Sequence, residues 1–133
     1  MLSDHSPVPT LAVTDLERAR GFYEGTLGFK PDAPPADADP SEGILYSSGA
    51  GRILVYPSAY AGTNKATAVA FDVPVAAFDA EVAALRSAGV EFQTFEMDGL
   101  EWDDGVASNG PMRSVWFADP DGNILNVGTL QPR

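Results

Sequence analysis

An internal repeat constrains the fold of this chain more than any other feature of its sequence. Residues 13–29 match residues 73–90, and Gly51–Val55 matches Gly122–Asn126. Each half is therefore predicted to be a strand, a helix and three further strands. One such βαβββ module has a helix on one face of its sheet, so the bare face must meet a partner or a ligand. Two modules predict an α+β protein with a curved eight-stranded mixed sheet, whose concave side forms a cleft.

The first helix is predicted to follow directly after a strand at Val8–Val13. Thr14 and Glu17 have the spacing of a capping box, in which each side chain accepts a hydrogen bond from the other residue's backbone N–H. Gly28 lies where a helix ends with a residue in the left-handed conformation. The helix is therefore expected to run from Thr14 to Gly28.

The other elements are predicted from apolar runs that are separated by turn residues. They are strands starting at Phe29 and at Ile44–Ser48, Arg52–Tyr56, Ala66–Val73, Val90–Phe95, Ser114–Ala118 and Ile124–Thr129, and a second helix from Val75 to Gly89. Residues 31–40 are too rich in proline and aspartate to enter a sheet interior, and Met97–Met112 is predicted to be a long loop. The whole chain, residues 1–133, is expected to be one domain with modules at about 8–57 and 66–130.

Cysteine is absent from the chain, and His5 is its only histidine. Without cysteine, no thiolate nucleophile, iron–sulfur cluster or cysteine-based zinc site is possible. Catalytic zinc, nickel and iron sites usually use two or three imidazoles, which one histidine near the N-terminus does not supply. These two counts disfavour most metal-centred functions and exclude thiol-based ones.

The chain is strongly acidic, with eight basic against nineteen acidic residues and a net charge of −11. This charge repels nucleic acids and anionic lipid surfaces, so neither is an expected partner. The ordinary interpretation of this charge is that it keeps the protein soluble. The functional interpretation is that it attracts a cationic ligand. The sequence has no apolar run of membrane-spanning length and no signal-peptide pattern. A cytoplasmic protein is therefore expected.

Two segments carry a resemblance to a known family. Residues 13–29 run from Val-Thr-Asp-Leu through Phe-Tyr to Leu-Gly-Phe, and residues 117–124 read Phe-Ala-Asp-Pro-Asp-Gly-Asn-Ile. Together with the repeat, they resemble the vicinal oxygen chelate superfamily, which includes glyoxalase I, extradiol dioxygenases, fosfomycin-resistance enzymes and bleomycin-resistance proteins. The resemblance extends over about residues 8–130 and implies the βαβββ fold and a homodimer. Both motifs are structural and do not select a reaction.

In the metal-dependent members of that superfamily, His or Glu side chains from the first and last strand of each module hold a divalent ion. The resemblance places these positions at Val8, Val55, Ala68 and Asn126. Three of these side chains are apolar and the fourth is a neutral amide, and a shift of one residue, for example to Leu54, restores no imidazole or carboxylate. We therefore expect neither a metal ion nor another cofactor.

Eight residues are candidates for ligand binding. They are Tyr46, Tyr56, Asp72, Glu101, Trp102, Arg113, Trp116 and Asn126. Trp102 lies beside acidic residues at 101, 103 and 104, and an indole next to carboxylates suits an organic cation. The alternative is an acidic, solvated loop whose tryptophan packs on the sheet.

For the other candidates, too, a structural role competes with a binding role. Arg113 either clamps a carboxylate or phosphate or forms a surface ion pair, and Asp72 either enters the cleft or caps the second helix. Asn126 either binds the ligand or is satisfied by the backbone. Tyr46, Tyr56 and Trp116 face either the helices or the cleft, depending on strand register.

These observations favour a small-molecule binding protein over an enzyme. We predict a metal-free protein, similar to bleomycin-resistance members, that sequesters an organic ligand of cationic or aromatic character in the concave cleft. The alternative is an enzyme of the superfamily, of the lyase, isomerase or dioxygenase type, and a third possibility is a regulatory or interaction domain with a vestigial cleft.

Overall fold

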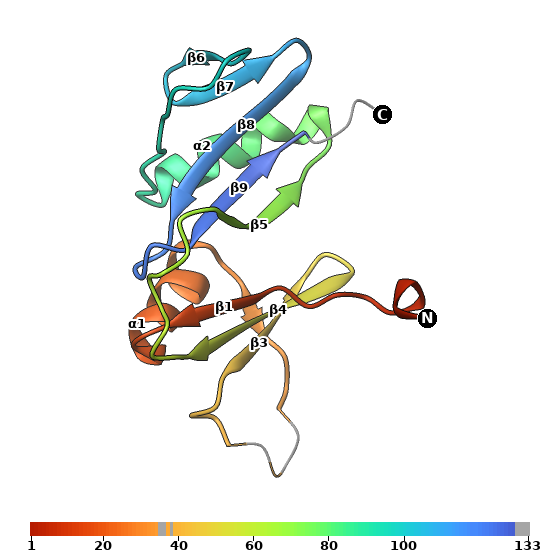
Figure 1. Cartoon of the computed structure of the whole chain (residues 1–133), viewed down its shortest axis with the longest axis vertical. Coiled ribbons are helices and arrows are strands. Elements are labelled where there is room, and N and C mark those ends of the chain that lie inside the picture. The colour runs from red at the N-terminus through yellow and green to blue at the C-terminus, as the bar shows by residue number, and fades with distance from the viewer. Residues whose placement is uncertain (35–36, 38, 130–133) are drawn as a thin grey trace. The chain divides into compact units, whose positions relative to one another are not determined.

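The computed structural model describes residues 1–34, 37 and 39–129 of the chain (Figure 1). These residues divide into two compact units. Unit 1 contains Met1–Lys65 together with Pro120–Asn123, and unit 2 contains Ala66–Asp119 and the chain from Ile124 onward. The predicted α+β class is confirmed, because the strands form two mixed sheets and helices accompany each. That the units form one domain stays a prediction.

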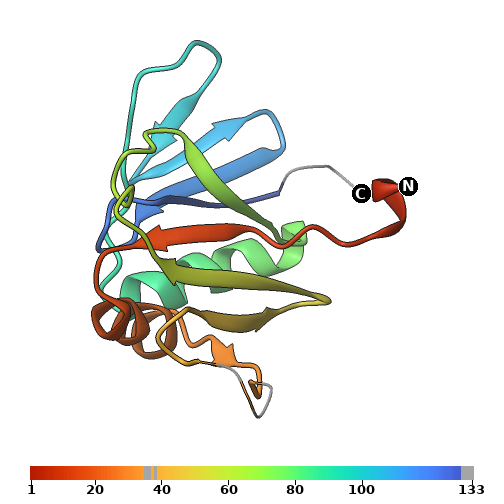
Figure 2. The same cartoon turned by 60° about the horizontal axis from the view of Figure 1, so that its bottom comes forward.

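Unit 1 holds a four-stranded sheet. Its strands are β1 (Thr10–Val13), β2 (Lys30–Pro31), β3 (Ile44–Ser48) and β4 (Gly51–Pro57), and its helical segments are η1 (Leu2–Asp4), α1 (Leu16–Arg20) and the π-helical η2 (Gly21–Thr26). The order is β1-β4-β3-β2, as Figure 2 shows, with β1 parallel to β4 and the other pairs antiparallel. Positions 35, 36 and 38 of the predicted 31–40 loop lie outside the described residues.

The core of unit 1 lies on the face of this sheet that α1 and η2 cover. Its buried side chains are Leu11, Val13, Ala19, Tyr23, Tyr46, Ile53 and Val55. The register pairs Leu11 with Val55, and Tyr46 with Ile53, so these strand residues share one face. Their neighbours in sequence, including Leu54, point to the other face because side chains alternate along a strand.

The start of the first helix differs from the prediction. Asp15, not Thr14, is the N-cap, and its carboxylate accepts a hydrogen bond from the Arg18 backbone N–H at 3.2 Å. Thr14 does not form the capping box because its backbone N–H and hydroxyl both donate to Asp121. The predicted helix end is confirmed, because Gly28 has a φ of 76°, a conformation that costs glycine no steric strain.

Unit 2 holds a five-stranded sheet in the order β5-β9-β8-β7-β6. Its strands are β5 (Thr67–Asp72), β6 (Glu101–Asp103), β7 (Val106–Asn109), β8 (Met112–Ala118) and β9 (Ile124–Gly128), and its helices are η3 (Val75–Ala77) and α2 (Phe78–Ser87). β5 runs parallel to β9, and the other pairs are antiparallel. The order β5-β9-β8-β7 thus repeats β1-β4-β3-β2 of unit 1, and β6 adds a fifth strand.

Two predictions for unit 2 are wrong. Met97–Met112 is not a long loop, because β6 and β7 form a hairpin within it. Its two turn residues, Asp104 and Gly105, both have positive φ, of 50° and 79°, as a type I′ turn requires. Val90–Phe95 is not a strand and contributes only a single bridge between Gln93 and Trp116. The described residues therefore contain nine strands, where the repeat predicts eight.

None of the helices in the described part of the chain has the length and apolar character needed to cross a membrane.

Candidate functional site on the open face of unit 2

The sheet of unit 2 has two different faces. One face carries the buried core, and Arg113 marks it because its guanidinium lies 4.5 Å from the ring centroid of Phe78 in α2. The buried side chains of this helix face are Phe78, Val82, Val115, Phe117, Leu125 and Val127. The alternate residues of the same strands point to the opposite face, which we call the open face.

Two rows of cross-strand partners cross the open face. The first row runs from Trp102 through Ala107, Ser114 and Gly128 to Asp72, and the second runs from Trp116 through Asn126 to Ala70. Side chains in directly opposed positions lie next to each other on one face. The register therefore gathers two tryptophans, an amide, a hydroxyl and a carboxylate on a surface whose other members are small.

Three aromatic rings pack together on this face. The ring of Phe95 meets Trp102 edge-on at a centroid distance of 5.3 Å and meets Trp116 at 4.9 Å. The two indoles lie 6.1 Å apart. These separations are typical of favourable aromatic pairs. The chain has only two tryptophans, so both of them belong to this aromatic cluster.

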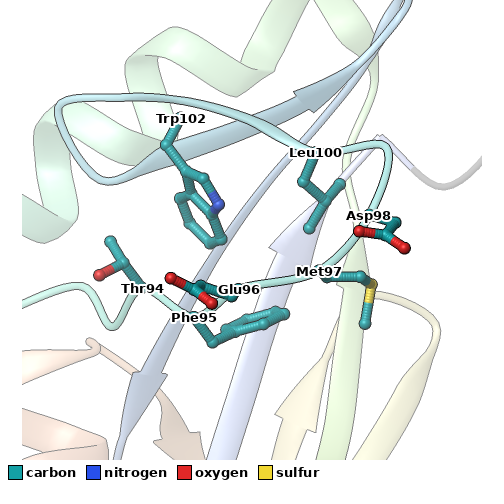
Figure 3. A pocket seen from close by; sticks show the side chains of 7 residues that line it. All are labelled: Thr94, Phe95, Glu96, Met97, Asp98, Leu100 and Trp102. Atoms are coloured by element: carbon teal, nitrogen blue, oxygen red, sulfur yellow. The ribbon is translucent and has the colours of Figure 1, made fainter.

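A hollow of about 630 Å³ opens beside the cluster (Figure 3). It is lined by Thr94, Phe95, Glu96, Met97, Asp98, Leu100 and Trp102. Figure 3 shows the side chains of Trp102 and Leu100 pointing toward the ring of Phe95. Of the described residues that line the hollow, two are acidic and none is basic.

The structure brings four of the eight sequence candidates to the open face. They are Asp72, Trp102, Trp116 and Asn126. The candidates did not include Phe95, Glu96 or Asp98, because the predicted strand and loop gave no reason to place them beside a tryptophan. The Asp104-Gly105 turn signal in the sequence predicts the hairpin that carries Trp102, and it is the signal that identifies this site.

Two candidates lie on the helix face of unit 2. Arg113 donates a hydrogen bond to Asp79 Oδ1 at 2.8 Å, and this bond is the main reason that the pKa of Asp79 is lowered. Glu101 alternates with Trp102 in β6 and therefore points away from the hollow. Asp104, which the sequence places beside Trp102, forms an ion pair with Arg86.

The two tyrosine candidates lie in unit 1. Tyr46 is buried in the core, stacks on Tyr23 at 6.0 Å and donates its hydroxyl hydrogen to Glu24 Oε2 at 2.8 Å. Burial first, and then this hydrogen bond, raise the pKa of the Tyr46 phenol well above its ordinary value. Tyr56 is half-buried on the opposite face of the sheet, where its cross-strand partner is Ala12.

Comparison with known families now identifies the architecture. The model of the Glyoxalase/Bleomycin resistance protein/Dioxygenase superfamily matches residues 7–127. The chain belongs to this superfamily. No curated protein matches the chain, so the superfamily assignment rests on the family model.

Solved structures of the superfamily fold cover nearly the whole chain. The fosfomycin resistance protein FosX of Mesorhizobium loti is 17% identical, covers 96% of this chain and 93% of its own, and has a TM-score of 0.65. A lactoylglutathione lyase of Agrobacterium tumefaciens is 17% identical over 93% and 92%, with a TM-score of 0.63. An integron cassette protein from the Halifax Harbour sewage outfall is 22% identical over 91% and 94%, with a TM-score of 0.62. At these identities the likeness shows the fold alone.

The metal positions of the superfamily need one correction in this chain. Val55 is only 1% exposed and lies on the helix face of unit 1. Leu54 lies on the opposite face and pairs with Thr10 of the parallel first strand, as Asn126 pairs with Ala70 in unit 2. The equivalent position is therefore Leu54, and the prediction of Val55 is wrong by one residue.

The corrected positions do not fit a divalent ion. Val8, Leu54 and Ala68 carry no donor atom, and Asn126 carries a neutral amide. In the described part of the chain, no three His, Asp or Glu side chains gather where they would share a metal ion. Divalent metals in proteins are held by imidazole, thiolate or carboxylate ligands, so the superfamily's metal chemistry has no donor set here.

Proposed function

We propose that this protein binds a small organic cation with an aromatic or apolar body in the hollow beside Trp102, without a metal ion. One observation carries the proposal: the hollow is lined by the aromatic side chains of Phe95 and Trp102 together with two acidic residues and no basic one. Among the functions found in the superfamily, this is the kind of binding expected of a bleomycin-resistance-like protein rather than of a metalloenzyme.

Electrostatics favours a positively charged ligand at this position. A cation over an indole or phenyl face gains about 0.5–2 kcal/mol, depending on how far it is desolvated. Glu96 and Asp98 line the same hollow, and neither forms an ion pair with a described residue. The net charge of −11 adds a long-range field of the same sign. An anionic ligand would be repelled by these two carboxylates, and it would find no guanidinium among the residues that line the hollow.

Enzymatic activity is the alternative, and the open face gives it less support. Metal-dependent lyase, isomerase or dioxygenase chemistry requires ligands that Val8, Leu54, Ala68 and Asn126 do not provide. His5 is the only histidine of the chain and is not among the residues that line the hollow, so the lining supplies no imidazole as a general base.

Tryptophan fluorescence reports on this site alone, because the chain's two tryptophans both lie in the aromatic cluster. We would titrate the protein with 4-nitrobenzylammonium, a quenching aromatic cation, and with 1-ethyl-4-nitrobenzene, a neutral molecule of the same shape. We expect saturable quenching by the cation with a Kd below about 1 mM, at least about tenfold tighter than for the neutral molecule. EDTA should not change it.

Matched variants separate the site from the general acidity of the chain. Glu96→Gln and Glu101→Gln each remove one exposed carboxylate, the first at the hollow and the second on the helix face. We expect Glu96→Gln to weaken binding of the cation about three- to tenfold and Glu101→Gln to leave it unchanged. Equal binding of the neutral molecule, equal effects of the two variants, or a requirement for added metal would each overturn the proposal.

A further inference from the structure

Arg86 connects the two segments of chain that carry the aromatic side chains of the hollow. Phe95 belongs to the segment that follows α2, and Trp102 belongs to the β6–β7 hairpin. Arg86 lies in the last turn of α2. Its guanidinium lies 5.3 Å from the ring centroid of Phe92, in the same segment as Phe95, and it donates two hydrogen bonds to Asp104 in the hairpin turn. One side chain therefore contacts both segments.

The contact with Asp104 holds the hairpin turn at two points. Arg86 Nη1 donates to the carboxylate oxygen Oδ2, and Nη2 donates to the backbone carbonyl oxygen of the same residue. A guanidinium presents its N–H groups in one rigid plane, so two simultaneous bonds restrict the orientation of the turn as well as its distance from α2. The turn also packs directly against Phe92, because a Cβ atom added at Gly105 would lie 3.3 Å from Phe92 Cβ.

The position of Trp102 depends on this turn. Trp102 is the middle residue of β6, the edge strand of the sheet, and only the pair of Asp103 and Val106 separates it from the turn. A three-residue strand at a sheet edge has few hydrogen bonds of its own to hold it in place. The contacts at the turn therefore help to determine where the indole lies, at 5.3 Å from the ring of Phe95 and 6.1 Å from that of Trp116.

We propose that Arg86 is a positioning residue of the cation site, which fixes Trp102 relative to Phe95 and thereby sets the affinity of the hollow. This inference rests on the proposed function and adds a residue that is not among those lining the hollow. The side chains of Arg86 and Asp104 are 38% and 82% exposed, and ion pairs this exposed contribute little to overall stability. The effect of Arg86 is therefore on the geometry of the site.

The sign of the effect separates positioning from charge. Arg86→Ala removes one positive charge, so the electric field of the protein alone would strengthen binding of a cation. Loss of the contacts at the hairpin turn weakens binding instead. Arg113→Ala is the matched control, because Arg113 also lies over an aromatic ring and also pairs with an aspartate. Its partners, Phe78 and Asp79, lie at the start of α2 and not in the hairpin turn.

Two measurements test the role of Arg86. The first is the exciton signal of the two indoles in the far-UV circular dichroism spectrum of the ligand-free protein, which depends on their distance and mutual angle. The second is the affinity for 4-nitrobenzylammonium by tryptophan quenching. We expect Arg86→Ala to lose most of the exciton signal and to bind the cation about three- to tenfold more weakly, through loss of part of the cation–π energy. Arg113→Ala should keep the exciton signal and the affinity of the wild type.

Arg86→Lys provides a second test at constant charge. It replaces the rigid planar fork with a flexible ammonium, so we expect a reduced exciton signal and binding at least about twofold weaker. If Arg86→Ala does not fold, as judged by thermal unfolding, Arg86→Lys decides by the same two measurements.

Three outcomes would overturn the positioning role. They are a wild-type exciton signal in the folded Arg86 variants, an affinity equal to or above that of the wild type, and equal losses in Arg113→Ala. Failure of the proposed function is a separate result. It follows if the wild-type protein binds 4-nitrobenzylammonium no more tightly than neutral 1-ethyl-4-nitrobenzene, and the exciton signal then still decides whether Arg86 positions Trp102.

Discussion

The hydroxyl of Thr14 donates a hydrogen bond to Asp121 Oδ1 at 2.7 Å, although the two residues are 107 positions apart in the chain. The same oxygen accepts from the Thr14 backbone N–H at 3.0 Å and from Arg18 Nη2 at 3.1 Å. Asp121 belongs to the short segment Pro120–Asn123, which is part of unit 1. The Asp121 carboxylate, from a turn far away in sequence, thus accepts hydrogen bonds from Thr14, just before α1, and from Arg18, in its first turn.

Removal of this carboxylate should destabilise unit 1. The Asp121 side chain is only 4% exposed. Asp121→Ala would leave the backbone N–H and the hydroxyl of Thr14 without their acceptor and would remove the ion pair with Arg18. We expect the free energy of unfolding to fall by about 2–3 kcal/mol, measured by urea denaturation with circular dichroism. Glu17→Ala is the control, because the capping box that the sequence predicts is not formed, and it should cost less than about 0.5 kcal/mol. An equal loss of unfolding free energy in Glu17→Ala would contradict this, because Glu17 would then stabilise the helix start as the predicted capping box requires.

The buried phenol of Tyr46 should make stability depend on alkaline pH. Burial and the hydrogen bond to Glu24 raise its pKa, so above the ordinary phenol pKa of about 10 the unfolded chain loses a proton that the folded protein keeps. The stability that Tyr46 contributes is therefore complete below about pH 10 and is lost as the pH rises beyond it. The difference in unfolding free energy between wild type and Tyr46→Phe should shrink from about pH 8 to about pH 11. A constant difference would contradict the burial of this hydroxyl.

Arg113 should contribute to stability but not to ligand binding. Its guanidinium lies over Phe78 and pairs with Asp79, both at the start of α2. Arg113→Ala should lower the free energy of unfolding by about 0.5–1 kcal/mol through loss of the contact with the ring. Binding of 4-nitrobenzylammonium should change by less than about twofold, because Arg113 lies on the helix face. A large loss of affinity in the folded variant would mean that the two faces are assigned wrongly.

Gly128 should not tolerate a side chain while Ser114 is present. The new Cβ of Gly128→Ala would overlap Ser114 Oγ and would lie 3.2 Å from the carbonyl oxygen of Arg113. Forcing β8 and β9 apart should cost about 1–3 kcal/mol, measured by thermal unfolding. The double variant Gly128→Ala/Ser114→Ala should recover part of this loss, because the overlapping oxygen is gone. If the double variant is no more stable than Gly128→Ala, the overlap with Ser114 Oγ is not the cause of the destabilisation.

Much of the fold is predictable from local patterns. The apolar periodicity predicts both helical segments, and the glycines at 28 and 89 predict their ends, which the structure confirms with positive φ at both glycines. These features depend on residues close together in sequence, and their physical causes are hydrophobic periodicity and the steric freedom of glycine.

Strand register is less accessible to sequence analysis. Because side chains alternate with a period of two, an error of one residue turns a side chain to the opposite face. For this reason the sequence assigns Val55, instead of Leu54, to a metal position of the superfamily. For the same reason the sequence does not decide which face of its sheet Arg113 or Tyr46 points to. The hairpin of β6 and β7 was predictable from Asp104-Gly105, but its charged residues at 101 and 103 hid the strand pattern.

The sequence by itself determined the repeat, the strong negative charge, and the lack of imidazole and carboxylate at the superfamily's metal positions, because these depend only on which residues occur and in what order. The tertiary structure decided which side chains meet. Pairing across β5, β9, β8 and β7 placed Trp116, Asn126 and Ser114 together, and chain folding brought Phe95 against Trp102. Such contacts depend on register and on long-range packing, which the local pattern of residues does not encode.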